Sequence, residues 1–191
     1  MSVPRAVLDA DIVFSRVLHE LMGRLATGAR LFELVWSEEL LDEAKSSLMK
    51  RKGLSADAAQ AWVGHMRREF PNGGVDLAGV PGGFDLASMT RDPGDVHVCS
   101  LVIAGSVDLL FTFDRGYLKE PLREHGVEVP DIDRFLIAQC DEQPQAMARI
   151  VEAQADVWSG GRPLEELLLA FERANVPGFA SALRSLLDVS G

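Results

Sequence analysis

The sequence predicts an α/β fold in which helices flank a central parallel sheet, followed by a C-terminal helical appendage. Short apolar runs typical of buried strands alternate with segments of helical periodicity, and this alternation indicates a parallel sheet. From Pro144 onward only helical spacing remains. The length of 191 residues suits one domain with a modest appendage, and 47% apolar residues suffice for a core. We expect an α/β domain over 1–141 and a helical extension over 142–191.

Two of the expected strands end at an aspartate. The run Val3–Leu8 is short, apolar and β-branched, and it stops at Asp9. The run 108–113 (DLLFTF) is typical of a strand covered on both faces, and Asp114 follows it. A third short strand is expected at Val127–Val129. Because active sites on such sheets lie beyond the carboxyl ends of the strands, Asp9 and Asp114 are expected to share a site.

The other segments carry helix signals. Ser37 is expected to begin a helix that Gly53 ends, and Asp92 with Pro93 is expected to begin another. The latter segment is rich in Val and Ile, so a strand is its alternative. A loop is expected over 71–83, which holds five glycines and two prolines. Helices are expected over 12–26, 37–52, 55–70, 93–105, 119–125, 131–140 and, in the appendage, on both sides of a break at Gly160-Gly161 and again after Pro177.

Composition bears on partners and location. The formal net charge is −10, with 29 acidic and 19 basic residues, which gives no general attraction for nucleic acid and weighs against RNA binding. Cys99 and Cys140 show no zinc-ligand spacing and are expected to be reduced thiols. Charges near the N-terminus leave no signal-peptide segment, and the longest uncharged run, 96–107, is too short for a membrane span. We expect a cytoplasmic protein without a membrane partner.

Four acidic residues stand at element junctions: Asp9, Glu43, Asp95 and Asp114. Metal-assisted phosphodiester hydrolysis needs such a set, because Mg²⁺ and Mn²⁺ prefer oxygen ligands. One or two ions bridge the scissile phosphate, activate a water and stabilise the leaving oxygen. Without a cation the clustered carboxylates would repel one another.

Each of these acids also has a structural interpretation. Asp9 is a possible helix cap, a role for which Asp11 competes. Glu43 fits a solvated helix position, Asp95 a capping pair with Asp92, and Asp114 a turn. Taken singly, the structural role is favoured for Glu43 and nearly equal for the others. Taken jointly, with two acids at strand ends, a shared site is favoured.

Four segments resemble, in order and spacing, the motifs of PIN-domain ribonucleases. They are VLDADIVFS (7–15), WSEELLDEA (36–44), DPGDVHV (92–98) and LLFTFDRGYL (109–118), and the resemblance covers about residues 3–136. It implies a PIN-like three-layer fold with Asp9, Glu43, Asp95 and Asp114 as metal ligands and catalytic residues. It also implies a supporting hydroxyl at Thr112, and Ser15 as a lesser polar neighbour. The chain departs from the family at Asp11, where Asn is common, and at Gly116, where many relatives carry another acid.

The helical extension resembles that of one subgroup of VapC-type toxins. The resemblance implies an Mg²⁺- or Mn²⁺-dependent endoribonuclease, the toxin of a bacterial toxin–antitoxin pair. Its implied partners are an RNA substrate and a protein antitoxin, and a homodimer stays open.

Two alternatives remain. VLDADIV also fits the opening of haloacid-dehalogenase-type phosphatases, with Asp9 as nucleophile and Asp11 as acid/base. That chemistry needs a catalytic Lys and a later metal motif, and the sequence after Asp95 shows no acid at the required spacing. The second alternative is a PIN-like interaction module without activity. His97 and the basic clusters 50–52 and 67–68 are expected to be solvated helix positions rather than site residues.

Overall fold

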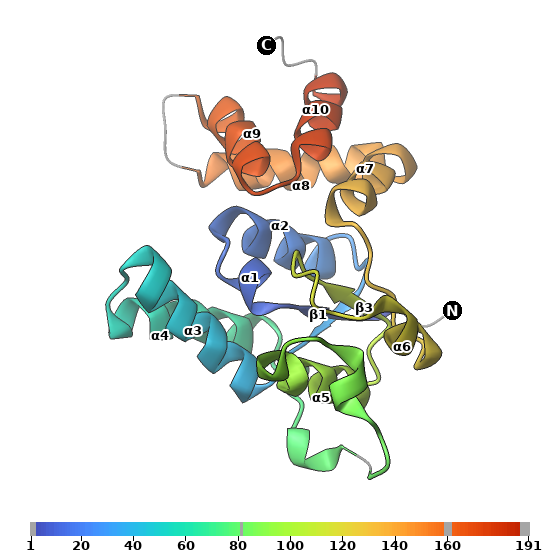
Figure 1. The fold of residues 1–191 in the computed structure, drawn as a ribbon. Coiled ribbons are helices and arrows are strands. Elements are labelled where there is room, and N and C mark those ends of the chain that lie inside the picture. The colour runs from blue at the N-terminus through green and yellow to red at the C-terminus, as the bar shows by residue number, and fades with distance from the viewer. Residues whose placement is uncertain (1–2, 81, 159–161, 188–191) are drawn as a thin grey trace. The chain divides into compact units, whose positions relative to one another are not determined.

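The computed structural model describes residues 3–80, 82–158 and 162–187 (Figure 1). It divides into two compact units. The sheet unit comprises Met1–Phe14 and Leu31–Val129, and the helical unit comprises Ser15–Arg30 and Pro130–Gly191. The units meet in sequence at 129/130, earlier than the predicted boundary at 141/142, because α7 (Ile132–Glu142) packs with the C-terminal helices. The expected mixed α/β class is confirmed.

Three parallel strands form the sheet, in the order β2-β1-β3. They are β1 (Arg5–Leu8), β2 (Glu33–Val35) and β3 (Leu109–Phe111). The two strands expected to end near Asp9 and Asp114 are therefore neighbours, and helices flank the sheet (Figure 1). The strand expected at 127–129 is reduced to a single bridge between Leu109 and Glu128.

The helices of the sheet unit begin and end where the local signals indicate. The Ser37 hydroxyl accepts from the Leu40 N–H at the start of α3, and Gly53 ends α3 with a positive φ of 66°. Asp92 caps the short 3₁₀ turn that leads into α5, so helix rather than strand follows it. The α-helices of this unit are α1 (Ala10–Val13), α3 (Glu38–Lys52), α4 (Ala56–Glu69), α5 (Val96–Ala104) and α6 (Lys119–Glu124). Three 3₁₀ turns are η1 (Leu77–Gly79), η2 (Leu86–Met89) and η3 (Pro93–Asp95).

The expectation of a single helix over 12–26 is wrong, because this segment belongs to two separate helices. α1 ends at Val13, and α2 runs over Arg16–Thr27. Ser15 between them has an extended backbone, with φ −80° and ψ 105°, which interrupts the helical hydrogen-bond pattern. The division into two compact units falls at this same break.

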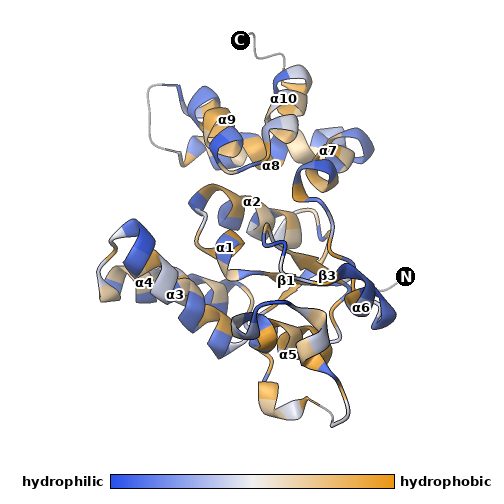
Figure 2. Ribbon diagram, in the orientation of Figure 1, coloured by the Kyte–Doolittle hydropathy of each residue, from blue (hydrophilic) through white to orange (hydrophobic). Residues whose placement is uncertain are grey.

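The helical unit buries its apolar stripes internally. It consists of α2, α7, α8 (Pro144–Asp156), α9 (Pro163–Arg173) and α10 (Pro177–Leu186), and each of the last three begins with proline. Each carries both hydrophobic and hydrophilic residues (Figure 2). Phe171 and Phe179 are fully buried and stack edge-to-face with ring centroids 5.1 Å apart. Asp133 accepts from the first free N–H groups of α10, at Gly178 and Phe179. The helices expected in the tail are confirmed, and the expected break at Gly160-Gly161 lies outside the described residues.

No helix within the described ranges has both the length and the apolar character needed to cross a membrane.

We predict that Gly73→Ala destabilises the sheet unit. The Gly73 carbonyl accepts from the Trp36 N–H at 2.9 Å, which holds the segment beside the end of β2. A Cβ at Gly73 would lie 2.2 Å from the Leu34 carbonyl oxygen, so the backbone must shift. Overpacking of this kind costs about 1–3 kcal/mol or more. A thermal melt should show a lower Tm for Gly73→Ala, whereas Gly79→Ala, whose Cβ would meet nothing within 4 Å, should change little. Equal melting temperatures for the two variants would contradict this account.

Candidate functional site

A pocket of about 250 Å³ opens at the carboxyl ends of β1 and β3. It brings together all four acids expected at a metal site, although they come from four separate segments. Asp9 follows β1, Glu43 lies on α3, Asp95 ends η3 and Asp114 follows β3. The residues that line the pocket are Asp9, Ala10, Asp11, Phe14, Glu43, Ser47, Arg51, Asp95, Phe113 and Asp114.

Asp9 is the most deeply buried acid of the pocket, with 6% of its surface exposed. One carboxylate oxygen accepts from the Ala10 N–H at 2.7 Å, so Asp9 caps α1 as well as lining the pocket. The other oxygen accepts from the Thr112 hydroxyl, also at 2.7 Å. The Thr112 hydroxyl in turn accepts from the Asp114 N–H at 2.9 Å, so this hydroxyl links two of the acids. Burial raises the pKa of Asp9, and these hydrogen bonds offset the rise in part.

Asp11 lies in the same pocket with one carboxylate oxygen satisfied. Its Oδ2 accepts from the Phe113 N–H at 2.9 Å. Its Oδ1 is buried and has no hydrogen-bond partner among the described residues. Burial, followed by the negative charge of Asp9, raises the pKa of Asp11 from 3.8 to about 7.

The two remaining aspartates of the pocket, Asp95 and Asp114, differ in their local roles. Asp95 does not cap the turn before α5: that cap is Asp92, whose Oδ1 accepts from the Gly94 N–H at 2.8 Å. Burial, and then the charges of Asp9 and Asp114, raise the pKa of Asp95 to about 6. Asp114 does take part in a turn, since its Oδ1 accepts from the Gly116 N–H at 2.6 Å. A Cβ at Gly116 would lie 3.0 Å from Asp114 Oδ1 and 3.7 Å from Asp95 Oδ2, so both carboxylates border this glycine.

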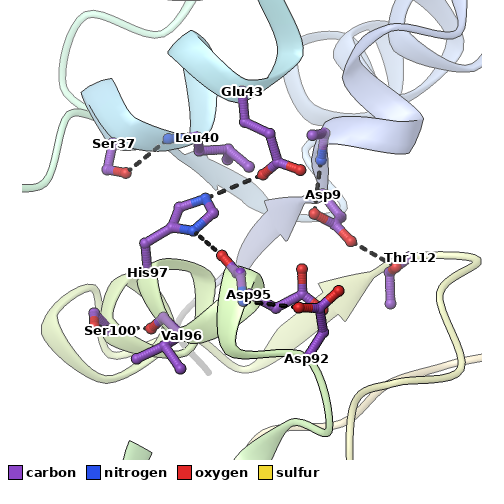
Figure 3. Close-up of polar contacts among 12 residues, drawn as sticks. Asp9, Ser37, Leu40, Glu43, Asp92, Asp95, Val96, His97, Ser100 and Thr112 are labelled. Atoms are coloured by element: carbon purple, nitrogen blue, oxygen red, sulfur yellow. Dashed lines mark hydrogen bonds and ion pairs between the residues drawn. The ribbon is translucent and has the colours of Figure 1, made fainter. Parts of the chain in front are cut away.

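Glu43 faces an ion-pair partner, His97, for which a solvated helix position was expected. His97 Nε2 lies 3.1 Å from Glu43 Oε2, and the His97 side chain is only 22% exposed (Figure 3). His97 Nδ1 lies 2.7 Å from the Gly94 carbonyl oxygen, which only accepts, so Nδ1 carries a proton. Contact with the Glu43 carboxylate raises the pKa of His97 and favours the imidazolium form. The expectation of a solvated His97 is therefore wrong, because the packing of α3 against α5 places it beside Glu43.

No role was expected for Tyr117, which lies close to Asp9. It is 4% exposed, and its buried hydroxyl lies near the Asp9 carboxylate. Burial, and then the charges of Asp9 and Asp95, raise the pKa of Tyr117 above its usual range, so the phenol stays protonated. Its position three residues after Asp114 was the available signal. Ser15, predicted as a lesser polar neighbour of the site, is not among the residues that line the pocket; it is the N-cap residue of α2.

The donor set fits a hard divalent cation. All the acidic groups that line the pocket are carboxylates, which Mg²⁺ and Mn²⁺ prefer. Asp11 Oδ1 is buried without a hydrogen-bond donor among the described residues, so it is free to accept a cation. As the side chains stand, however, no group of three or more His, Cys, Asp or Glu residues in the described ranges is arranged so that it could hold a metal ion. Like charges repel one another, so clustered carboxylates need either a bound cation or bound protons to offset the repulsion.

We predict that Asp11→Asn changes the pH dependence of stability. Because its pKa rises from 3.8 to about 7 on folding, Asp11 binds more protons in the folded than in the unfolded state between those values. This group's contribution to stability therefore falls as the pH rises through that range and stays low above it. Urea unfolding in EDTA should show Asp11→Asn gaining stability relative to wild type between pH 4 and pH 8. The exposed Glu39→Gln serves as control. If the free energies of unfolding of Asp11→Asn and wild type differed by the same amount at every pH, the pKa of Asp11 would not change on folding, and this account would be wrong.

Comparison with known proteins assigns no family. No protein-family model matches the chain, and neither a curated protein nor a solved structure matches it significantly. Any function therefore has to be argued from the chemistry of the pocket.

Proposed function

We propose that this protein is a divalent-metal-dependent endoribonuclease with a PIN-like three-layer fold, the VapC-type toxin of a bacterial toxin–antitoxin pair. One observation carries the proposal: five carboxylates from four segments line a single pocket at the carboxyl ends of two neighbouring parallel strands. Burial, followed by the charges of neighbouring carboxylates, raises the pKa values of Asp11 and Asp95, and such perturbed pKa values are frequent at functional sites. In this proposal the protein is cytoplasmic, its substrate is RNA and its partner is a protein antitoxin, with a homodimer open.

Each residue has a role in the proposed chemistry. Asp9, Glu43, Asp95 and Asp114 would hold the Mg²⁺ or Mn²⁺, which when bound supplies Lewis-acid stabilisation and an activated water. Thr112 fixes the Asp9 carboxylate by donating to Oδ2, and it fixes the backbone at Asp114 by accepting from its N–H.

The pocket favours a nuclease over the phosphatase alternative. A haloacid-dehalogenase-type mechanism needs a lysine beside the nucleophilic Asp9, and no lysine lines the pocket in the described part of the chain. It also leaves Glu43 and Asp114 without roles, although both face the same space as Asp9. An inactive interaction module would have no use for five converging carboxylates that weaken the fold by mutual repulsion.

We predict that the purified, antitoxin-free protein cleaves RNA with Mg²⁺ or Mn²⁺ and stops with EDTA. Asp9→Asn and Glu43→Gln should lower the rate by at least about a hundred-fold, because each removes a charged ligand. Asp42→Asn is the matched control, since Asp42 neighbours Glu43 on α3 but is exposed and does not line the pocket. Circular dichroism would verify that all variants fold. Cleavage by Asp9→Asn at the wild-type rate, or a phosphate trapped covalently on Asp9, would overturn the proposal.

We predict that Asp95→Asn separates metal binding from helix capping. Without metal, the change removes one of several repelling charges, so the Tm in EDTA should rise or stay the same. The Tm increase caused by Mn²⁺ should shrink, because a ligand stabilises the fold only as far as it binds the folded state. Asp92→Asn is the control, since Asn caps about as well as Asp and Asp92 does not line the pocket. Equal Mn²⁺-induced shifts in the two variants would exclude Asp95 as a ligand.

A further inference from the structure

One face of α3 continues the pocket beyond the carboxylates. Glu43, Ser47 and Arg51 are spaced by four residues and therefore lie on the same side of the helix. All three line the pocket. The pocket wall thus changes along α3 from a carboxylate, through a hydroxyl, to a guanidinium. Arg51 is the one cationic side chain among the described residues that line it.

The Arg51 guanidinium is available to an anion. It is exposed, and no carboxylate lies within ion-pair distance of it in the described ranges. It lies over the ring of Phe14, with 5.7 Å between the guanidinium carbon and the ring centroid. Phe14 also lines the pocket, so this contact orients the guanidinium beside the cavity. Arg67, in the other basic cluster of the sheet unit, is instead bound to Glu38 through two hydrogen bonds.

The position of the basic residues in α3 has a second, simpler cause. Lys50, Arg51 and Lys52 form its last turn, where cations interact favourably with the helix dipole. The interaction with the helix dipole applies equally to all three residues. It does not explain why Arg51 alone of the three lines the pocket, on the same face of α3 as Glu43 and Ser47.

We propose that Arg51 and Ser47 form a phosphate-binding subsite for single-stranded RNA, next to the carboxylates. The inference rests on the proposed nuclease function and names how that site holds its substrate. The guanidinium would pair with a phosphodiester adjacent to the one over the carboxylates, and the Ser47 hydroxyl would donate to the same phosphate. Phe113 lines the pocket and is half-buried, so its ring offers a stacking surface for an unpaired base. The ribose 2′-hydroxyl can donate a hydrogen bond to a pocket carboxylate, and DNA lacks this group. The pocket is therefore expected to prefer RNA over DNA.

The test compares Arg51→Ala with Lys50→Ala, which removes one positive charge from the same helical turn but from a residue outside the pocket lining. Binding of a fluorescein-labelled single-stranded RNA is measured by anisotropy in the Asp9→Asn background at several salt concentrations. Arg51→Ala should weaken binding about ten-fold or more, as the loss of a charged hydrogen bond does. It should also reduce the slope of log K against log salt by about 0.7, the value for one phosphate contact of a single strand. Lys50→Ala should change binding by less than about two-fold, and Arg51→Lys should restore part of the affinity.

Two further measurements separate the inference from the proposed function. In the background with Asp9 intact, Arg51→Ala should raise the KM for RNA cleavage more than it lowers kcat, and the Mn²⁺-induced Tm shift should be preserved. If that background cleaves RNA but Arg51→Ala and Lys50→Ala behave alike, the subsite is overturned and the nuclease proposal stands. If it neither binds nor cleaves RNA, both fall. Equal, Arg51-dependent affinity for a DNA oligonucleotide of the same sequence would overturn RNA as the ligand.

Discussion

The burial of the Asp9 carboxylate at the end of the central strand is the constraint around which the sheet unit is arranged. A carboxylate withdrawn from water costs several kcal/mol unless hydrogen bonds or a cation compensate for the lost hydration. Two hydrogen-bond donors compensate in part for the hydration that Asp9 loses: the first N–H of α1 and the hydroxyl of Thr112. The acidic neighbours do not stabilise the Asp9 carboxylate, since the charge of Glu43 raises its pKa further. A bound cation would supply the remaining compensation.

Strand order explains how remote residues reach this point. β1 lies between β2 and β3, so the segment after β1 and the segment after β3 emerge side by side at one edge. α3 begins three residues after β2 ends, and it carries Glu43 and Arg51 along one face. η3 then places Asp95 in the pocket, and α5 places His97 against α3. The sheet therefore fixes two aspartates directly, and packing between helices fixes the glutamate and the histidine.

This division also marks what the sequence could predict. Ser37 and Gly53 bound α3 through contacts within one turn, so local chemistry was enough to predict them. Asp9 and Asp114 were predicted to share a site because the carboxyl ends of parallel strands lie at the same edge of a sheet. The break at Ser15 was missed because apolar spacing continues through it, and spacing carries no information about one residue's backbone angles. His97 was missed because its contact with Glu43 depends on how two helices pack, and no local pattern reports that packing.

The overall charge bears on how the proposed substrate enters. With a formal net charge of −10 and a pocket lined by five carboxylates, the metal-free protein repels a phosphodiester. A divalent cation would reduce this local negative charge and offer a direct ligand position to a phosphate oxygen, so RNA should bind more tightly to the metal-loaded than to the metal-free protein. Linkage requires the reverse as well: RNA must raise the affinity for the metal by the same factor. Arg51, at the far end of the same helix face, is charged whether or not metal is present, so its contribution to RNA affinity should persist in EDTA. Metal-dependent and metal-independent parts of RNA binding would then map to opposite ends of one face of α3.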